Sequence, residues 1–155
     1  KYKHNDMEAL EKELQKCEPD AIKLIVVDSV FSMEGDLANL PEIVRLKKKY
    51  NATVYVDEAH GLGVFGRNGR GVCDHFGVTE DIDLIMGTFS KSLASIGGFV
   101  AGDKDVSTGC ATMHVLTYSR LVILLLLLLR QWKLCIFSRQ SRNVRKTCGK
   151  LQIMH

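Results

Sequence analysis

The chain has 155 residues, of which 46% are hydrophobic and 25% charged, and these proportions are ordinary for a globular protein with its own core. Its five cysteines are odd in number and show no C-x-x-C spacing; they suggest no zinc site and fit free thiols in a reducing compartment, so we expect a cytoplasmic protein. No apolar run approaches the roughly 20 residues that a membrane-spanning helix needs.

The charge is divided unevenly along the sequence. Residues 1–105 carry 13 Lys and Arg against 18 Asp and Glu, a net charge of −5, whereas residues 106–155 carry 8 Lys and Arg and no acid, a net charge of +8. Because domains seldom lack carboxylates over such a length, the two parts need separate explanations. The chain begins at Lys1 with polar and charged residues and no initiator Met, so we expect that it was cut from a longer protein, and no signal peptide is visible.

The first predicted elements are a helix and a strand. Over residues 6–17, the apolar side chains Met7, Leu10 and Leu14 recur at helical spacing among charged residues, which predicts an amphipathic helix. A proline between two acidic residues ends this helix. Residues 22–27 are apolar except for Lys23 and are rich in β-branched side chains, which predicts a buried strand.

A second helix and three further strands follow. Residues 41–50 begin with a proline and end in a lysine-rich turn, and both features favour a helix. Residues 53–56, 82–86 and 97–101 are short, mostly apolar segments that predict strands. Strands separated by helices of about ten residues indicate an α/β fold with a largely parallel sheet, and ligands of such sheets bind beyond the carboxyl ends of the strands.

Polar side chains follow two of these strands. Lys91 follows one strand among hydroxyl side chains, and Asp57 and His60 follow another. These side chains suit pyridoxal phosphate, because a lysine amine can bind its aldehyde, a carboxylate can keep its pyridine nitrogen protonated, and small hydroxyls can bind its phosphate. Because Asp57 and Thr88 lie at predicted strand ends, we expect them to face one crevice. The competing interpretation is that Lys91 is a solvated loop residue.

Other motifs have simpler interpretations. Residues 61–66 satisfy G-x-G-x-x-G, but they neither start at the strand end nor open a helix, so a glycine loop lining a cleft is favoured over a dinucleotide site. Residues 57–60 spell the D-E-A-H box of helicases, but no phosphate loop precedes them in this chain. Residues 47–49 are interpreted as a solvated helix end rather than a nucleic-acid contact. His4 and His75 have no evident partner, and surface or structural roles are expected.

Several motifs occur in a fixed order over about residues 3–105. They are His4-Asn5-Asp6-Met7, Val30-Phe31-Ser32-Met33-Glu34-Gly35-Asp36, Val56-Asp57-Glu58-Ala59-His60-Gly61, Gly69-Arg70-Gly71 and Gly87-Thr88-Phe89-Ser90-Lys91-Ser92. Together they resemble the α-oxoamine synthase family of pyridoxal phosphate enzymes. The resemblance implies the aspartate aminotransferase type of fold, in which residues 1–105 would form an incomplete part of the large, cofactor-binding domain with its mostly parallel sheet.

The resemblance also implies a role for each matching site residue. Lys91 would bind the aldehyde of the cofactor and later act as acid and base at the α-carbon of the substrate. Asp57 would pair with the pyridine nitrogen, and His60 would donate to the phenolic oxygen. Thr88 would contact the phosphate, and Ser32 would lie against the cofactor. No metal ligand is implied.

The implied reaction is a decarboxylating condensation of an amino acid with an acyl-CoA. Around Lys91, the sequence is most similar to the branch that joins serine to palmitoyl-CoA in sphingolipid biosynthesis, whereas glycine C-acetyltransferase and 8-amino-7-oxononanoate synthase are less similar relatives. Enzymes of this family are homodimers much longer than this chain, with cofactor contacts from both subunits. We therefore expect a homodimer for the full-length enzyme, no nucleic-acid partner and no activity from this chain alone.

Residues 106–155 do not continue the resemblance. Residues 121–129 are nine consecutive apolar residues, which ordinarily indicate a buried helix. A shifted reading frame explains both this apolar run and the lack of acidic residues. When each codon is made to start at the old third base, successive leucine codons of the form CTN become codons of the form NCT. Codons chosen this way for residues 107–155 permit a continuous string that includes the S-A-S-x-T-P motif of the family. We therefore predict that this tail is out of frame, with a basic, apolar binding module as the alternative.

Overall fold

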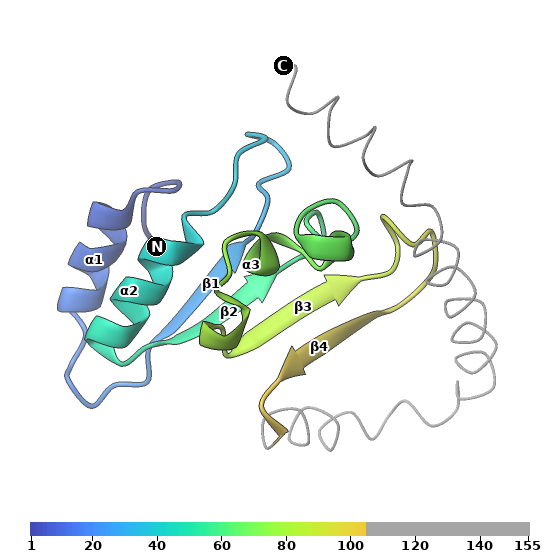
Figure 1. Ribbon diagram of the computed structural model, residues 1–155. Coiled ribbons are helices and arrows are strands. Elements are labelled where there is room, and N and C mark those ends of the chain that lie inside the picture. The colour runs from blue at the N-terminus through green and yellow to red at the C-terminus, as the bar shows by residue number, and fades with distance from the viewer. Residues whose placement is uncertain (105–155) are drawn as a thin grey trace.

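The computed structural model describes residues 1–104, and Figure 1 shows their arrangement. In chain order the elements are α1 (Met7–Gln15), β1 (Leu24–Asp28), α2 (Leu40–Tyr50), β2 (Thr53–Asp57), η1 (Arg67–Gly69), α3 (Val72–His75), η2 (Thr79–Asp81), β3 (Leu84–Thr88) and β4 (Gly98–Gly102). No helix in this part of the chain is long and apolar enough to cross a membrane. The apolar run and the changed reading frame predicted for residues 106–155 lie outside the described residues.

The four strands form one sheet in the order β1-β2-β3-β4. β1 pairs in parallel with β2, and β2 with β3, whereas β4 runs antiparallel to β3. Figure 1 shows the first three arrows pointing toward one edge of the sheet and β4 returning beside β3. The predicted α/β fold with a largely parallel sheet is confirmed.

Polar side chains fix the ends of the two long helices. Asp6 caps α1 by accepting a hydrogen bond from the N–H of Ala9 at 2.9 Å, and Asn39 caps α2 through the N–H of Glu42 at 3.4 Å. Asn51 ends α2 with a φ of +49°, a left-handed conformation that asparagine adopts more readily than most residues. Both predicted helices are confirmed, and these caps explain where they begin and end.

The core lies between one face of the sheet and the helices α1 and α2. The buried apolar side chains of α1, α2, β1 and β2 are at most 6% exposed: Leu10, Leu14, Ile25, Val27, Leu40, Ile43, Val44, Leu46, Val54 and Val56. Burial of one such side chain contributes on the order of 2 kcal/mol. This packing holds the ends of β1 and β2, which carry part of the candidate site.

The opposite face of β1 is open in the described part of the chain. Leu24 and Val26 are 59% and 58% exposed, and Ile22 lies outside the strand and is 98% exposed. The prediction of a buried strand is therefore wrong for this face. The reason is that, among residues 1–104, the core covers only the side of β1 that carries Ile25 and Val27.

The lysine run at the end of α2 is engaged in ion pairs. Each of its three side chains meets a carboxylate from another segment: Lys47 meets Asp83 at 2.7 Å, Lys48 meets Asp81 at 2.6 Å, and Lys49 meets Glu11 at 2.7 Å. These contacts join α2 to α1 and to the segment before β3. The positive charges are thus balanced within the fold.

Candidate cofactor site

The candidate site lies at the carboxyl edge of the parallel strands. Asp28 on β1 is opposite Asp57 on β2, and Asp57 is opposite Met86 on β3, so β3 continues past this line to Thr88. Figure 1 shows the loops that follow β1, β2 and β3 at this same edge. Ligands of parallel α/β sheets bind there.

Asp57 and Thr88 share one face of the sheet. Side chains alternate along a strand, so Met86 and Thr88 point to the same side, and Asp57 points there because it is opposite Met86. By the same register this is the open face, which also carries Val26. Both Asp57 and Thr88 are half-buried. The fold thus brings a carboxylate and a hydroxyl from neighbouring strand ends to one side of the sheet.

The carboxylate of Asp57 is held by its own turn and is otherwise unpaired in the described part of the chain. Its Oδ1 accepts a hydrogen bond from the N–H of Ala59 at 2.7 Å, and no Lys or Arg among residues 1–104 forms an ion pair with it. Burial, and after it the charge of Asp57, raises the pKa of Tyr55. An anionic acceptor with an uncommitted oxygen suits a protonated ring nitrogen.

Lys91 lies on an exposed loop between β3 and β4. Backbone hydrogen bonds close this loop, from the N–H of Phe89 to Gly97 O at 2.9 Å and from the N–H of Ser95 to Phe89 O at 2.8 Å. The Lys91 side chain forms no ion pair with residues 1–104. Its amine is therefore free to meet an aldehyde that enters from the open side.

Two hydroxyl side chains, those of Thr88 and Ser90, precede Lys91 in the chain. Thr88 Oγ1 and Ser90 Oγ lie 2.8 Å apart, and the N–H of Ser90 donates to Thr88 Oγ1 at 3.3 Å. A hollow of about 340 Å³ opens beside Thr88, and it is lined by Met86, Gly87, Thr88, Gly98, Phe99 and Val100. Glycine is required at position 98, because a Cβ there would lie 2.6 Å from the carbonyl oxygen of Gly87. Small hydroxyls next to a hollow are suited to a phosphate group.

The other two predicted site residues lie on exposed loops. His60 is three residues beyond Asp57, and Ser32 lies on the loop that joins β1 to α2. In the described part of the chain, neither side chain forms a hydrogen bond to Asp57, Thr88 or Lys91. The structure therefore joins Asp57 and Thr88 on one face and places the remaining three residues on the loops that follow β1, β2 and β3.

The loop between β1 and α2 is anchored by the N-terminal segment. Asn5 donates to Asp36 Oδ2 at 3.1 Å and to Leu37 O at 3.0 Å. His4 Nε2 lies 3.2 Å from the Asp36 carboxylate, and its ring meets Phe31 edge-on with the centroids 4.4 Å apart. His4 thus has a structural partner, which spacing alone does not indicate because the two residues are far apart in the sequence.

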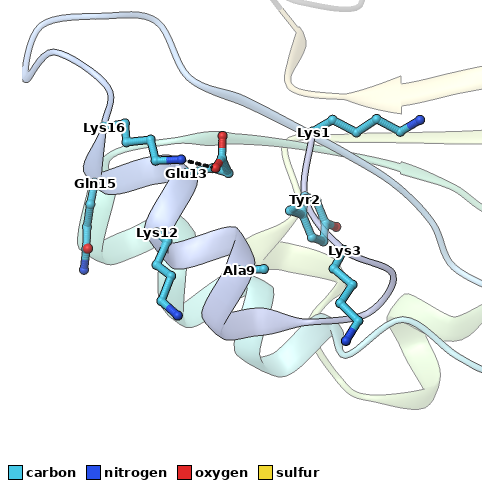
Figure 2. A pocket seen from close by; sticks show the side chains of 8 residues that line it. All are labelled: Lys1, Tyr2, Lys3, Ala9, Lys12, Glu13, Gln15 and Lys16. Carbon is cyan, nitrogen blue, oxygen red and sulfur yellow. Dashed lines mark hydrogen bonds and ion pairs between the residues drawn. The ribbon is translucent and has the colours of Figure 1, made fainter.

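A second hollow lies on the other side of the molecule. It has a volume of about 440 Å³ and is lined by Lys1, Tyr2, Lys3, Ala9, Lys12, Glu13, Gln15 and Lys16, as Figure 2 shows. Figure 1 places α1, which forms one wall, across α2 from β3 and β4. Its lysines could also meet an aldehyde or a phosphate, but its one carboxylate, Glu13, is already paired with Lys16.

The residues at the carboxyl edge fit pyridoxal phosphate at both ends. The unpaired carboxylate of Asp57 suits the ring nitrogen, the unpaired amine of Lys91 suits the aldehyde, and the hydroxyls of Thr88 and Ser90 suit the phosphate. Among residues 1–104, no group of three or more His, Cys, Asp or Glu is placed to hold a metal ion.

A sequence profile of the family named Aminotransferase class I and II matches residues 1–126. The chain belongs to this family. It is 79% identical over 106 residues to a serine palmitoyltransferase of Bacteroides ovatus, a match that covers 68% of this chain and 27% of that protein. It is 54% identical over 105 residues to an 8-amino-7-oxononanoate synthase of Petrotoga mobilis, which covers 66% of this chain and 27% of the relative.

A solved structure agrees with these matches. A serine palmitoyltransferase variant from S. paucimobilis with a bound PLP–myriocin aldimine is 46% identical, with a TM-score of 0.63, over 65% of this chain and 25% of that one. The resemblance to α-oxoamine synthases is therefore confirmed, and the family uses pyridoxal phosphate for C-acyl transfer. The chain spans about a quarter of the length of the relatives it matches.

Proposed function

We propose that residues 1–105 are part of the large domain of an α-oxoamine synthase that condenses serine with palmitoyl-CoA and releases coenzyme A and carbon dioxide. The observation that supports this most is the placement of Asp57 and Thr88 on one open face, next to the loop that carries Lys91. The 79% identity to a serine palmitoyltransferase supports serine as the amino acid. The alternatives are the reactions of glycine C-acetyltransferase and of 8-amino-7-oxononanoate synthase, and a relative named for the second is 54% identical.

Each site residue has a separate task in this proposal. When bound, pyridoxal phosphate supplies an electron-accepting ring next to the α-carbon of the amino acid. The Asp57 carboxylate binds the ring nitrogen and keeps a proton on that atom, and His60 donates to the phenolic oxygen. The Lys91 amine holds the aldehyde carbon, and later removes a proton from the α-carbon of the substrate and returns one. Thr88 binds the phosphate, and Ser32 lies against the cofactor.

Titration of the purified chain with pyridoxal phosphate tests the proposal. A visible absorbance band should appear with the wild-type chain and with Lys12→Ala, which removes a lysine of the second hollow, but not with Lys91→Ala. Addition of serine should then change the band more than addition of glycine does. A missing band, or a band that Lys91→Ala leaves unchanged, would contradict the proposal and favour a chain that does not bind the cofactor.

The proposal extends to the protein beyond the described residues. The full-length enzyme is proposed to be a cytoplasmic homodimer, and residues 106–155 are proposed to be an out-of-frame tail. The extent of the match to curated relatives, 106 residues, and the lack of Asp and Glu after residue 105 support the second point. Sequencing the locus tests it: bases after the Asp105 codon that cannot be regrouped into a continuation of the family sequence would contradict it.

A further inference from the structure

Glu58, the residue after Asp57, has a buried side chain. It is 1% exposed, and among residues 1–104 it is the one acidic residue that is buried as a whole. Its carboxyl is directed into the core, whereas Asp57 faces the open side of the sheet. A carboxyl group is costly to remove from water unless hydrogen bonds replace its hydration, so the partners of Glu58 define what it does.

The Glu58 carboxyl accepts hydrogen bonds from two other segments. Ser29 Oγ, just after β1, donates to Oε2 at 2.7 Å, and the N–H of Cys73, in α3, donates to Oε1 at 2.8 Å. The backbone of the same residues joins the strands: the N–H of Glu58 donates to Met86 O at 2.7 Å, and the N–H of Ser29 donates to Asp57 O at 2.8 Å. This Glu58 cluster, made of Ser29, Glu58 and Cys73, therefore ties the ends of β1 and β2 to β3 and α3.

The loop between β2 and α3 is folded around this carboxyl. A Cβ on Gly61 would lie 2.0 Å from Oε2 of Glu58, and a Cβ on Gly71 would lie 2.6 Å from its Cδ. Gly71 also has a φ of +108°, which side-chain-bearing residues rarely adopt. Two of the glycines in this loop are thus explained by the space that the Glu58 side chain occupies.

We propose that Glu58 is a positioning residue for Asp57, a role that rests on the proposed function. Asp57 is oriented by the N–H of Ala59 at 2.7 Å, and Glu58 is the residue between them in the chain. The Glu58 cluster fixes both the side chain and the backbone of Glu58. Because Asp57 precedes Glu58 in the chain, the cluster sets the direction in which the Asp57 carboxylate meets the ring nitrogen. Glu58 does not itself touch the cofactor.

The full chain carrying Glu58→Ala tests this role. The substitution leaves the donors of Ser29 and Cys73 without their acceptor, so the affinity for pyridoxal phosphate should fall about tenfold or more. The pH profile of the visible band should shift toward that of Asp57→Asn, which loss of a merely structural residue would not cause. Glu58→Gln fills the same space and still accepts from Cys73, so it should restore both readouts, and Glu18→Gln, at an exposed site, is the matched control.

Labelling of Cys73 by a thiol reagent reports on the Glu58 cluster without any cofactor. Cys73 is 1% exposed in the intact fold, and it should be labelled about tenfold faster or more when Glu58→Ala releases the start of α3. Peptide mapping separates this site from the exposed Cys17. Faster labelling of Cys73 with an unchanged cofactor affinity and pH profile would overturn the positioning role and leave Glu58 as a structural residue only.

A milder variant keeps the test decisive if Glu58→Ala does not fold. Ser29→Ala removes one of the two donors to the carboxyl, so we expect an affinity loss of about two- to threefold and a pH shift in the same direction; no change in either would overturn the role. A wild-type chain that takes up no cofactor would instead overturn the proposed function, and the positioning role with it. The wild-type titration thus separates the two failures.

Discussion

The end of β2 carries the site carboxylate, Asp57, and the loop beyond β3 carries the site amine, Lys91. The chain that follows each strand is built differently. Beyond β2, the chain turns inward: Glu58 and Ala59 are 1% and 9% exposed, and the Glu58 cluster joins them to the neighbouring segments. Beyond β3, the chain turns outward: Ser90, Lys91 and Ser92 are exposed, and the loop is closed by its own backbone hydrogen bonds. The residues that follow Asp57 are thus buried, whereas Lys91 lies on a surface loop.

This contrast teaches where stability and binding are coupled. A carboxylate has to hold its direction toward one ring nitrogen, and buried neighbours provide that rigidity. A lysine forms its bond through a flexible side chain, so its loop needs fewer tertiary contacts. Substitutions beyond β2 should therefore change both folding and cofactor binding, whereas substitutions beyond β3 should change binding alone.

The largest loss of stability is expected for Gly71→Ala, on the β2 side. The new Cβ would lie 2.6 Å from Cδ of Glu58 at a φ of +108°, and strain and overpacking together should lower the free energy of unfolding by about 3 kcal/mol or more. Gly77→Ala is the matched control, because the φ of Gly77 is +70° but nothing lies within 4 Å of a Cβ added there. This substitution should lower the free energy of unfolding by about 1 kcal/mol. Urea unfolding measures both, and equal losses would contradict the crowding around Glu58.

Asn5→Asp extends the comparison to the loop beyond β1. The substitution removes the amide that donates to Asp36 and Leu37 and places a second carboxylate beside Asp36, so the free energy of unfolding should fall by about 2 kcal/mol. Adding Asp36→Asn restores an amide–carboxylate pair in reverse and should recover part of that loss. A double variant no more stable than Asn5→Asp alone would show that this contact does not anchor the loop.

A pH effect of about 1 kcal/mol is expected from Cys73 between pH 8 and about 9.5. Burial first, and then the adjacent Glu58, raises the pKa of the Cys73 thiol well above its usual range. Above the ordinary thiol pKa of about 8.5, the unfolded chain loses this proton while the folded chain keeps it, so stability falls as the pH rises. Cys73→Ala should flatten the slope of unfolding free energy against pH, and Cys17→Ala, at an exposed site, should not. If Cys73→Ala leaves the slope of unfolding free energy against pH unchanged, another group causes the pH effect and the prediction is contradicted.

The smallest effect on stability is expected for Lys91→Ala, on the β3 side. Lys91 is exposed and has no ion pair among residues 1–104, so the free energy of unfolding should change by less than about 0.5 kcal/mol. The same variant should nevertheless lose cofactor binding. Thermal unfolding without cofactor checks the first point, and a destabilisation as large as that of Asn5→Asp would contradict the description of this loop.

Much of the fold could be predicted because its determinants are local. The apolar runs before Asp57 and Thr88 predict β2 and β3, and the strand ends then place both residues at one edge. The proline and lysines of residues 41–50 predict α2. These features depend on residues within a few positions of one another, where propensity and periodicity are informative.

The remaining features depend on residues that are distant in the sequence. The Glu58 cluster joins Ser29, Glu58 and Cys73, and no spacing rule pairs them before the strands are assembled. The antiparallel direction of β4 and the open face of β1 likewise follow from pairing and from what covers each side. The sequence does contain one signal that the Glu58 side chain is buried. Side chains alternate along a strand, so if Asp57 at the strand end faces outward, the next side chain faces inward.

Covalent trapping tests the central claim most directly. The full chain is mixed with pyridoxal phosphate, reduced with borohydride and digested, and the modified lysine is identified by mass spectrometry. We predict that the label lies on Lys91 at near-stoichiometric yield and that Lys91→Ala loses it without gaining it elsewhere. A label found mainly in the second hollow, on Lys1, Lys3, Lys12 or Lys16, or spread evenly over exposed lysines, would contradict the assignment of the site to the carboxyl edge of β2 and β3.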